Sequence, residues 1–119
     1  MFKVINGWTK ERMKETIRER NNGTKSVNNT GYCQYKRVDV GQKPNHCAVG
    51  CFIPDTEYDE NLEGQGTIPY LLVNFPNLAR FMPLDNLPML TMQRLHDGAA
   101  CDVDLRDVLC NWIDENVID

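Results

Sequence analysis

Apolar residues in the last quarter of the chain recur at the spacing of an α-helix. They occupy positions i, i+3, i+4, i+7, i+8 and i+12, namely Leu105, Val108, Leu109, Trp112, Ile113 and Val117. Residues three and four apart share one helix face, so the pattern predicts an amphipathic helix here. Asp102 or Asp104 precedes it as a suitable N-cap.

A second helical pattern begins near Asn86 and ends at Gly98. The residues on its expected buried face are Leu87, Leu90, Thr91, Arg94 and Leu95. Upstream, Thr67 can cap a short helix with Pro69 in its first turn, and a turn or helix over 77–82 follows. The short helix is expected to bury Ile68, Leu71 and Leu72.

The N-terminal part is rich in charge but has clear helix boundaries. Thr9 is a good N-cap, and Asn21-Asn22-Gly23 is a good stop. The alternating charges of 10–20 are typical of a solvated helix. The apolar contacts available to it come from Trp8, Met13 and Ile17, so a narrow buried stripe is predicted.

The segment 32–53 favours a small β element. Tyr32–Lys36 alternates in the manner of a strand, and the turn residues of 39–45 predict a short hairpin or an extended excursion. The apolar run 46–53 is too short for its periodicity to separate a buried strand from two helical turns. We therefore expect an α+β fold, a mainly helical single domain over 1–119 with a small β-hairpin in its N-terminal third.

Composition is that of a globular protein. Hydrophobic residues make up 41% of the 119 and charged residues 25%, which excludes wholesale disorder. No apolar run approaches the roughly 18 residues that span a membrane, and the first residues lack a secretion signal. The five cysteines are an odd number without framework spacing, so free thiols and a cytoplasmic location are expected.

Charge is sorted by position along the chain. Ten of the 13 lysines and arginines precede Cys47, against four acids, whereas thirteen acids and three arginines follow His46. The net charge of -4 therefore combines a basic N-terminal part with a strongly acidic remainder. This sorting predicts either two electrostatic faces or one half folded against the other.

Cysteine catalysis is one enzymatic interpretation. Cys47 would be the nucleophile, His96 its base, and Asp97 or Asp102 the group that orients the imidazole. In the simpler interpretation, Cys47 is a small buried residue of an apolar run, and His96 is a polar residue at a helix C-terminus. The sequence shows no complete catalytic set, so we assign no catalytic residue.

Metal binding is also weakly indicated. Cys47 and Cys51 stand one helical turn apart, and candidate partners for a shared zinc ion are Cys33, His46 and His96. Structural zinc sites usually carry two tight pairs of ligands, and only one loose pair is present. The acids between Asp55 and Glu63 lack the glycine and the spacing of a calcium loop. We therefore expect neither a metal nor a cofactor.

A basic patch is formed in sequence by Lys36, Arg37 and Lys43. Together with Tyr32 and Tyr35 it could contact nucleic acid. Glutamates dilute the adjacent basic helix and the remaining chain is acidic, so neutralisation of that remainder is the favoured interpretation. The same basic and aromatic residues could instead line a pocket for a small molecule or a nucleotide.

The most distinctive motif is His46-Cys-Ala-Val-Gly-Cys-Phe-Ile-Pro-Asp55. It is accompanied by Trp8-Thr-Lys-Glu11, Tyr58-Asp59, Leu62-Glu63-Gly64, Leu95-His96-Asp97 and Trp112-Ile-Asp-Glu-Asn116. In these features the chain resembles a family of small uncharacterised proteins from bacteriophages and prophages. The resemblance covers most of the chain. It implies a phage accessory protein that acts on a host component, without implying an activity.

We therefore expect a non-enzymatic factor that binds and modulates or inhibits a host protein, for example in a defence or nucleic-acid system. Acidic small proteins can compete for basic clefts by electrostatic complementarity. The expected contact residues are Asp55, Glu57, Tyr58, Asp59, Glu60 and Glu63, with Tyr58 as the anchor. Two alternatives remain open: a cysteine-dependent hydrolase or transferase using Cys47 and His96, and a small-molecule- or nucleotide-binding protein.

Overall fold

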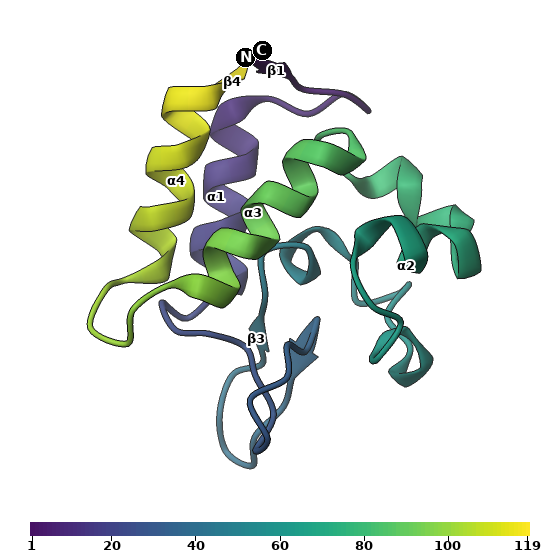
Figure 1. The fold of residues 1–119 in the computed structure, drawn as a ribbon, viewed down its shortest axis with the longest axis vertical. Coiled ribbons are helices and arrows are strands. Elements are labelled where there is room, and N and C mark those ends of the chain that lie inside the picture. The colour runs from purple at the N-terminus through teal and green to yellow at the C-terminus, as the bar shows by residue number, and fades with distance from the viewer.

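Helices form most of the framework of this protein, and the computed structural model describes all residues 1–119 (Figure 1). The α-helices are α1 (Lys10–Arg20), α2 (Ile68–Asn74), α3 (Asn86–Gly98) and α4 (Leu105–Asn116). Three 3₁₀ helices connect them: η1 (Gly50–Phe52), η2 (Glu60–Leu62) and η3 (Pro76–Phe81). The predicted fold class, a mainly helical α+β domain with a small hairpin, is confirmed.

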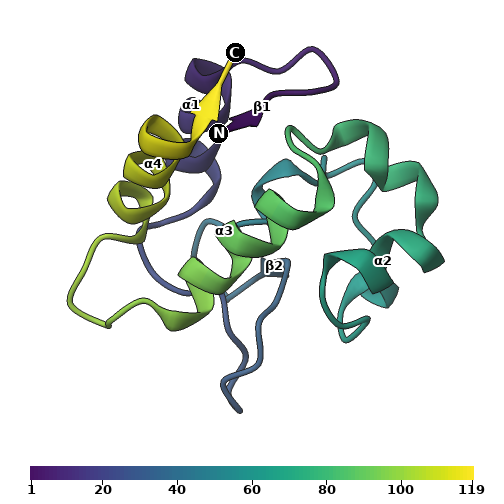
Figure 2. The same cartoon turned by 45° about the horizontal axis from the view of Figure 1, so that its top comes forward.

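Two short strand pairs complete the fold. The hairpin pairs β2 (Lys36–Arg37) antiparallel with β3 (Asn45–His46), as the turn chemistry predicts. The other pair joins β1 (Phe2–Lys3) in parallel with β4 (Val117–Ile118), and the two chain ends lie side by side in both views (Figures 1 and 2). No sequence pattern predicts this second pair.

The helices α1 and α4 lie side by side over the core (Figures 1 and 2). Met13 and Ile17 are the buried residues of α1, which confirms its narrow apolar stripe. The face that α4 buries is formed by Leu105, Leu109, Cys110 and Ile113. The predicted N-caps of these two helices are present, since Thr9 accepts a hydrogen bond from the Arg12 backbone and Asp104 accepts one from that of Arg106.

The sorted charges meet across this helix pair. Lys14 Nζ lies 2.9 Å from the carboxylate of Asp114, and Arg18 lies 3.2 Å from that of Asp107. The basic N-terminal helix is therefore folded against the acidic C-terminal helix, which is the second of the two predicted arrangements. These partly exposed pairs orient the two helices more than they stabilise them.

The helix α3 has the predicted bounds but buries a different face. Leu87 is 65% exposed, and Arg94 is also exposed. The residues that α3 buries are Pro88, Met89, Met92, Gln93 and His96. The expected face is wrong because Gln93 and His96 find hydrogen-bond partners in the interior and flexible methionines fill the remaining space.

The run 46–53 is neither a strand nor a helix throughout. His46 ends β3, a turn follows, and η1 begins at Gly50, while every residue of the run is buried. A Cβ atom at Gly50 would stand 1.9 Å from the carbonyl oxygen of Tyr35. Only glycine therefore lets this run pack directly beneath the loop that carries Tyr35.

The two short helical segments predicted over 67–82 are present as α2 and η3, but the side chain of Thr67 makes no capping hydrogen bond. The first turn of α2 contains Pro69, and Ile68 and Leu71 are buried. Leu72 is only partly buried. None of the helices is long and apolar enough to traverse a bilayer.

Candidate binding site

The largest cavity of the protein, about 790 Å³, lies between the loop 25–35, the turn 63–68 and α3. Its lining includes the aromatic side chains of Tyr32 and Tyr35. Polar groups of Cys33, Gln93 and Asp97 also face it. Its volume falls within the range typical of ligand sites, so this cavity is the leading candidate for a functional site.

Local hydrogen bonds shape the loop that carries the tyrosines. The side-chain oxygen of Asn28 accepts bonds from the backbone N–H groups of Thr30 and Tyr32, both at 3.0 Å. Gly31 adopts a φ of 85°, which closes the turn. Cys33 then pairs with Val27 in an isolated β-bridge, and this pairing fixes Cys33 at the edge of the cavity.

Glu63 connects two of the three walls of the cavity, the loop 25–35 and the turn 63–68. One carboxylate oxygen accepts a 2.9 Å bond from the backbone N–H of Tyr35, and the other accepts bonds from the Lys36 backbone and the Tyr58 hydroxyl. The Tyr35 hydroxyl donates in turn to the carbonyl of Gly66 at 3.0 Å. The loop and the turn are therefore tied together independently of any ligand.

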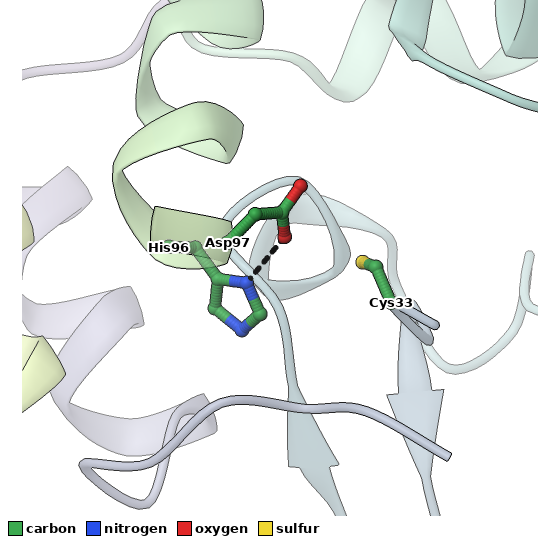
Figure 3. Close-up of side chains that lie close together, drawn as sticks. All are labelled: Cys33, His96 and Asp97. Carbon is green, nitrogen blue, oxygen red and sulfur yellow. Dashed lines mark hydrogen bonds and ion pairs between the residues drawn. The ribbon is translucent and has the colours of Figure 1, made fainter. Parts of the chain in front are cut away.

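The polar groups of the cavity belong to a network at the C-terminal end of α3, where His96, Asp97 and Cys33 lie close together (Figure 3). Nδ1 of His96 lies 2.9 Å from Asp97 Oδ1. The backbone N–H of Ser26 donates to the other ring nitrogen, Nε2, also at 2.9 Å. Since Nε2 accepts, Nδ1 carries the ring hydrogen and donates it to Asp97.

Gln93 completes the network with both ends of its amide. Its Nε2 donates to Asp97 Oδ1 at 2.9 Å and to Cys33 Sγ at 3.2 Å. Its Oε1 accepts a 3.0 Å bond from the backbone N–H of Val49. Gln93 therefore links α3, the loop and the buried run 46–53.

The carboxylate of Asp97 is ionised at neutral pH. Burial alone would raise the pKa of Asp97, but the hydrogen bonds from His96 and Gln93 outweigh it, so the pKa lies below its ordinary value. Asp97 remains about half exposed and lines the cavity, so its charge can act on a bound group.

The structure buries Cys47 completely. Burial and a hydrogen bond with Cys33 raise the pKa of the Cys47 thiol. The cysteine that lies beside His96 and Asp97 is Cys33, which the sequence indicated only as a possible zinc ligand. Neither ring nitrogen of His96 is free to accept a thiol proton, because one donates to Asp97 and the other accepts from Ser26.

The same hydrogen bonds decide what the cluster can do with a metal. Donor atoms of Cys33, His96 and Asp97 lie within 4.8 Å of one another, which is close enough to share an ion. A metal on Nδ1 would require the ring hydrogen to move to Nε2, where it would oppose the N–H of Ser26. The arrangement of Cys33, His96 and Asp97 therefore favours a hydrogen-bond network over a metal site. Cys51 lies apart from it, and burial raises the pKa of its thiol to about 12.

Most of the acidic residues predicted as partner contacts have partners within the chain. Asp55 pairs with Arg20 and Lys36, Glu57 lies 3.7 Å from Arg80, and Asp59 caps η2. Tyr58 is half-buried and donates to Glu63, which itself lines the cavity. Glu60 is exposed.

The residues of the predicted basic patch also have partners within the chain. Lys36 lies over the ring of Tyr58, with its ammonium 5.2 Å from the ring centre. Arg37 pairs with Asp39, and Lys43 donates to a backbone carbonyl at the end of α1. Neither Lys36 nor Lys43 lines the large cavity, whereas both tyrosines of this segment do.

Sequence reasoning missed Gln93 and Ser26 as site residues. Tyr32 and Tyr35 were recognisable as an aromatic pair, and the resemblance motif includes His96 and Asp97. Nothing in the sequence marks Gln93, because its partners Cys33 and Val49 are far away along the chain.

Comparison of the chain with protein-family models, with curated proteins and with solved structures gave no match in any of the three. The geometry of the cavity is therefore the basis on which a function can be argued.

Proposed function

We propose that this protein is a non-enzymatic binding protein of phage type. It modulates a host protein in the cytoplasm by receiving a basic side chain of that partner in the large cavity. The observation that carries the proposal is the ionised carboxylate of Asp97 in a cavity lined by Tyr32 and Tyr35.

The aromatic lining suits an interface anchor. Tyr32 is 73% exposed although it is a large aromatic residue, and exposed tyrosines are enriched at binding hot spots. Tyr70, which is 67% exposed, lies beside Gly66, and Gly66 is one of the residues that line this cavity. A partner side chain that enters here would therefore meet aromatic surface around the opening.

The charge of the cavity supports a cationic guest. Oδ1 of Asp97 accepts two hydrogen bonds from within the chain, which leaves Oδ2 as an acceptor for a guest. A lysine or arginine could pair with this oxygen and lie against a tyrosine ring. Lys25 also lines the cavity and limits its negative charge, so recognition requires the aromatic contact as well as the ion pair.

The polar groups of the network are already occupied by hydrogen bonds within the chain, and this supports binding rather than catalysis. A cysteine-dependent hydrolase needs an accessible thiol beside a free base. Cys47 is buried, and both nitrogens of His96 are committed to hydrogen bonds. Such a network holds Asp97 in a fixed orientation, which is what a binding site needs.

The experiment is affinity capture from bacterial lysate at low salt, with the wild type and two cavity variants, Asp97→Asn and Tyr32→Ala. Asn at position 97 can still accept from His96 but lacks the charge. The matched controls are Asp102→Asn and Leu87→Ala, which change exposed residues outside the cavity. We expect one captured protein, with recovery reduced at least about tenfold by both cavity variants and retained by both controls.

Two results would contradict this proposal. One is a wild type that captures no partner, and the other is a partner whose recovery is unaffected by Asp97→Asn and Tyr32→Ala. The cavity is also large enough for a small molecule or a nucleotide. Native mass spectrometry that finds a small ligand in the wild type, absent from Tyr32→Ala, would favour that alternative.

A further inference from the structure

A second cavity, of about 330 Å³, shares no lining residue with the first. It is lined by three arginines, Arg12 and Arg20 from the two ends of α1 and Arg80 from η3. Three cationic side chains that line one small cavity repel one another, so this arrangement favours negative charge nearby.

Aromatic rings hold two of the three guanidinium groups in place. Arg12 lies over the ring of Trp8 at 4.4 Å from its centre, and Arg80 lies over Phe81 at 4.8 Å. The indole N–H of Trp8 donates to the Phe81 carbonyl, which fixes the two rings relative to each other. A guanidinium stacked on a ring keeps its N–H donors directed outward from the ring edge, so these donors are ordered in advance of any ligand.

The third arginine has an unused donor. All three side-chain hydrogen bonds of Arg20 are donated by Nη2, and their acceptors are His46 Nε2, Ile53 O and Asp55 Oδ1. Its Nε is buried and has no acceptor in the protein. Buried donors are nearly always satisfied, so this orphan shows that the chain does not use the full donor capacity of Arg20, which lines the cavity.

The acids of the chain do not neutralise this cavity. Asp55 pairs with Arg20 but also serves Lys36, and Glu57 reaches only Arg80 at a distance of 3.7 Å. Arg12 donates to the backbone carbonyl of Gly7, and none of the ion pairs of the protein includes it. A positive cavity thus persists in a protein with a net charge of -4.

We propose that this cavity binds the phosphate group of a small phosphorylated molecule. A phosphate monoester carries close to two negative charges and three terminal oxygens, which matches the three guanidinium groups that α1 and η3 contribute to the lining. A cavity of about 330 Å³ accommodates the phosphate with a short substituent. This site does not depend on the partner proposed for the large cavity.

The test is an NMR titration with inorganic phosphate and then glycerol phosphate, at an ionic strength held constant with sodium chloride. It follows the indole N–H of Trp8 and the Nε–H signals of the arginines. The variants are Arg80→Gln and the double variant Arg12→Gln/Arg80→Gln, and the control is Arg94→Gln on the exposed face of α3. Arg80 has a side chain that is 70% exposed, so its replacement leaves the core intact.

We expect saturable shifts of the Trp8 and Arg20 signals in the wild type and in Arg94→Gln, and at least about tenfold weaker binding in the double variant. Shifts of the same size with chloride alone would overturn the proposal. So would phosphate binding that the double variant retains. A single-stranded oligonucleotide without terminal phosphates that binds more tightly than glycerol phosphate would assign the arginines to a nucleic-acid backbone instead.

Discussion

The backbone N–H of Ser26 donates a 2.9 Å hydrogen bond to Nε2 of His96, and both residues are completely buried. This one bond sets the tautomer of the ring and directs the Nδ1 hydrogen at Asp97. It also connects the loop 25–35 to the last turn of α3, which are two of the three elements that enclose the large cavity. The position of the Asp97 carboxylate therefore depends on a backbone group in another part of the chain.

Replacing His96 by leucine should destabilise the protein strongly. Leucine fills a similar volume but leaves the buried N–H of Ser26 without an acceptor, so we expect the free energy of unfolding to fall by about 2–4 kcal/mol. Urea denaturation measures the change. Leu87→Ala on the exposed side of the same helix is the control and should stay within about 0.5 kcal/mol of the wild type. A His96→Leu protein as stable as this control would show that the bond contributes little.

The close approach of Gly50 to Tyr35 predicts that alanine will lower the stability of the protein at position 50 but not at position 98. Alanine at position 50 would place its Cβ 1.9 Å from a backbone oxygen, so Gly50→Ala should cost about 3 kcal/mol or more, or prevent folding. Gly98 ends α3, and a Cβ atom added there would meet no other group within 4 Å, so Gly98→Ala should be neutral or stabilise by up to about 1 kcal/mol. Thermal unfolding of both variants tests the pair. Equal effects of the two substitutions would be inconsistent with the packing described for the run 46–53.

The five cysteines should react with alkylating reagents in order of their exposure. Cys101 is exposed and Cys33 is partly exposed, whereas Cys47, Cys51 and Cys110 are buried. Because burial also raises the pKa of the three buried thiols, we expect Cys101 to be modified first, Cys33 more slowly, and the others only on unfolding. Peptide mass spectrometry after timed exposure to iodoacetamide gives the order. Modification of Cys47 as rapid as that of Cys101 would instead support the alternative in which Cys47 is a nucleophile.

Stability should fall in mild acid because of His46. Burial, opposed by a bond to the Arg20 carbonyl and reinforced by the nearby Arg20 charge, holds the pKa of His46 below its ordinary value of 6.5. The unfolded chain therefore binds a proton that the folded protein does not, and stability is lost as the pH falls from about 6.5 towards the lower folded pKa. Asp55 has a lowered pKa as well, but its contribution is lost only in more acidic solution.

Urea denaturation at pH 7.5, 6.5 and 5.5 measures this dependence. We expect the free energy of unfolding of the wild type to decrease across the series, and the decrease to be smaller in His46→Gln, which has no group that titrates at this position. Parallel pH profiles for the two proteins would assign the effect to other residues.

The helix boundaries were predictable because their signals are local. Thr9 and Asp104 cap helices whose first turns follow directly in sequence, and the charge pattern of 10–20 needs no tertiary contact to be recognised. The buried face of α3 was not predictable in this way. Gln93 and His96 are buried only because Val49 and Ser26 supply hydrogen bonds from distant segments.

The residues of the candidate site were likewise predictable where their signals are local and unpredictable where they depend on distant contacts. His96 and Asp97 are neighbours in a motif, and Cys33 was visible as one cysteine among five. Gln93 and Cys33 are 60 residues apart, so no spacing rule links them. The sorted charge predicted that one half folds on the other. It did not predict that the acids of 55–63 would be used within the chain, because their cationic partners Arg20, Lys36 and Arg80 lie in three separate elements.

The packing of α1 against α4 has a consequence for how the protein folds during its synthesis on the ribosome. The helix α1 emerges before α4, its main packing partner, and closing so long a loop is entropically costly and slow. Until translation reaches α4, Met13 and Ile17 have only part of their final cover, and the lysines and arginines of α1 face the solvent without the aspartates that later oppose them. The segment up to His46 is thus cationic when it is made, and its charge is opposed only when the acidic residues that follow it are added.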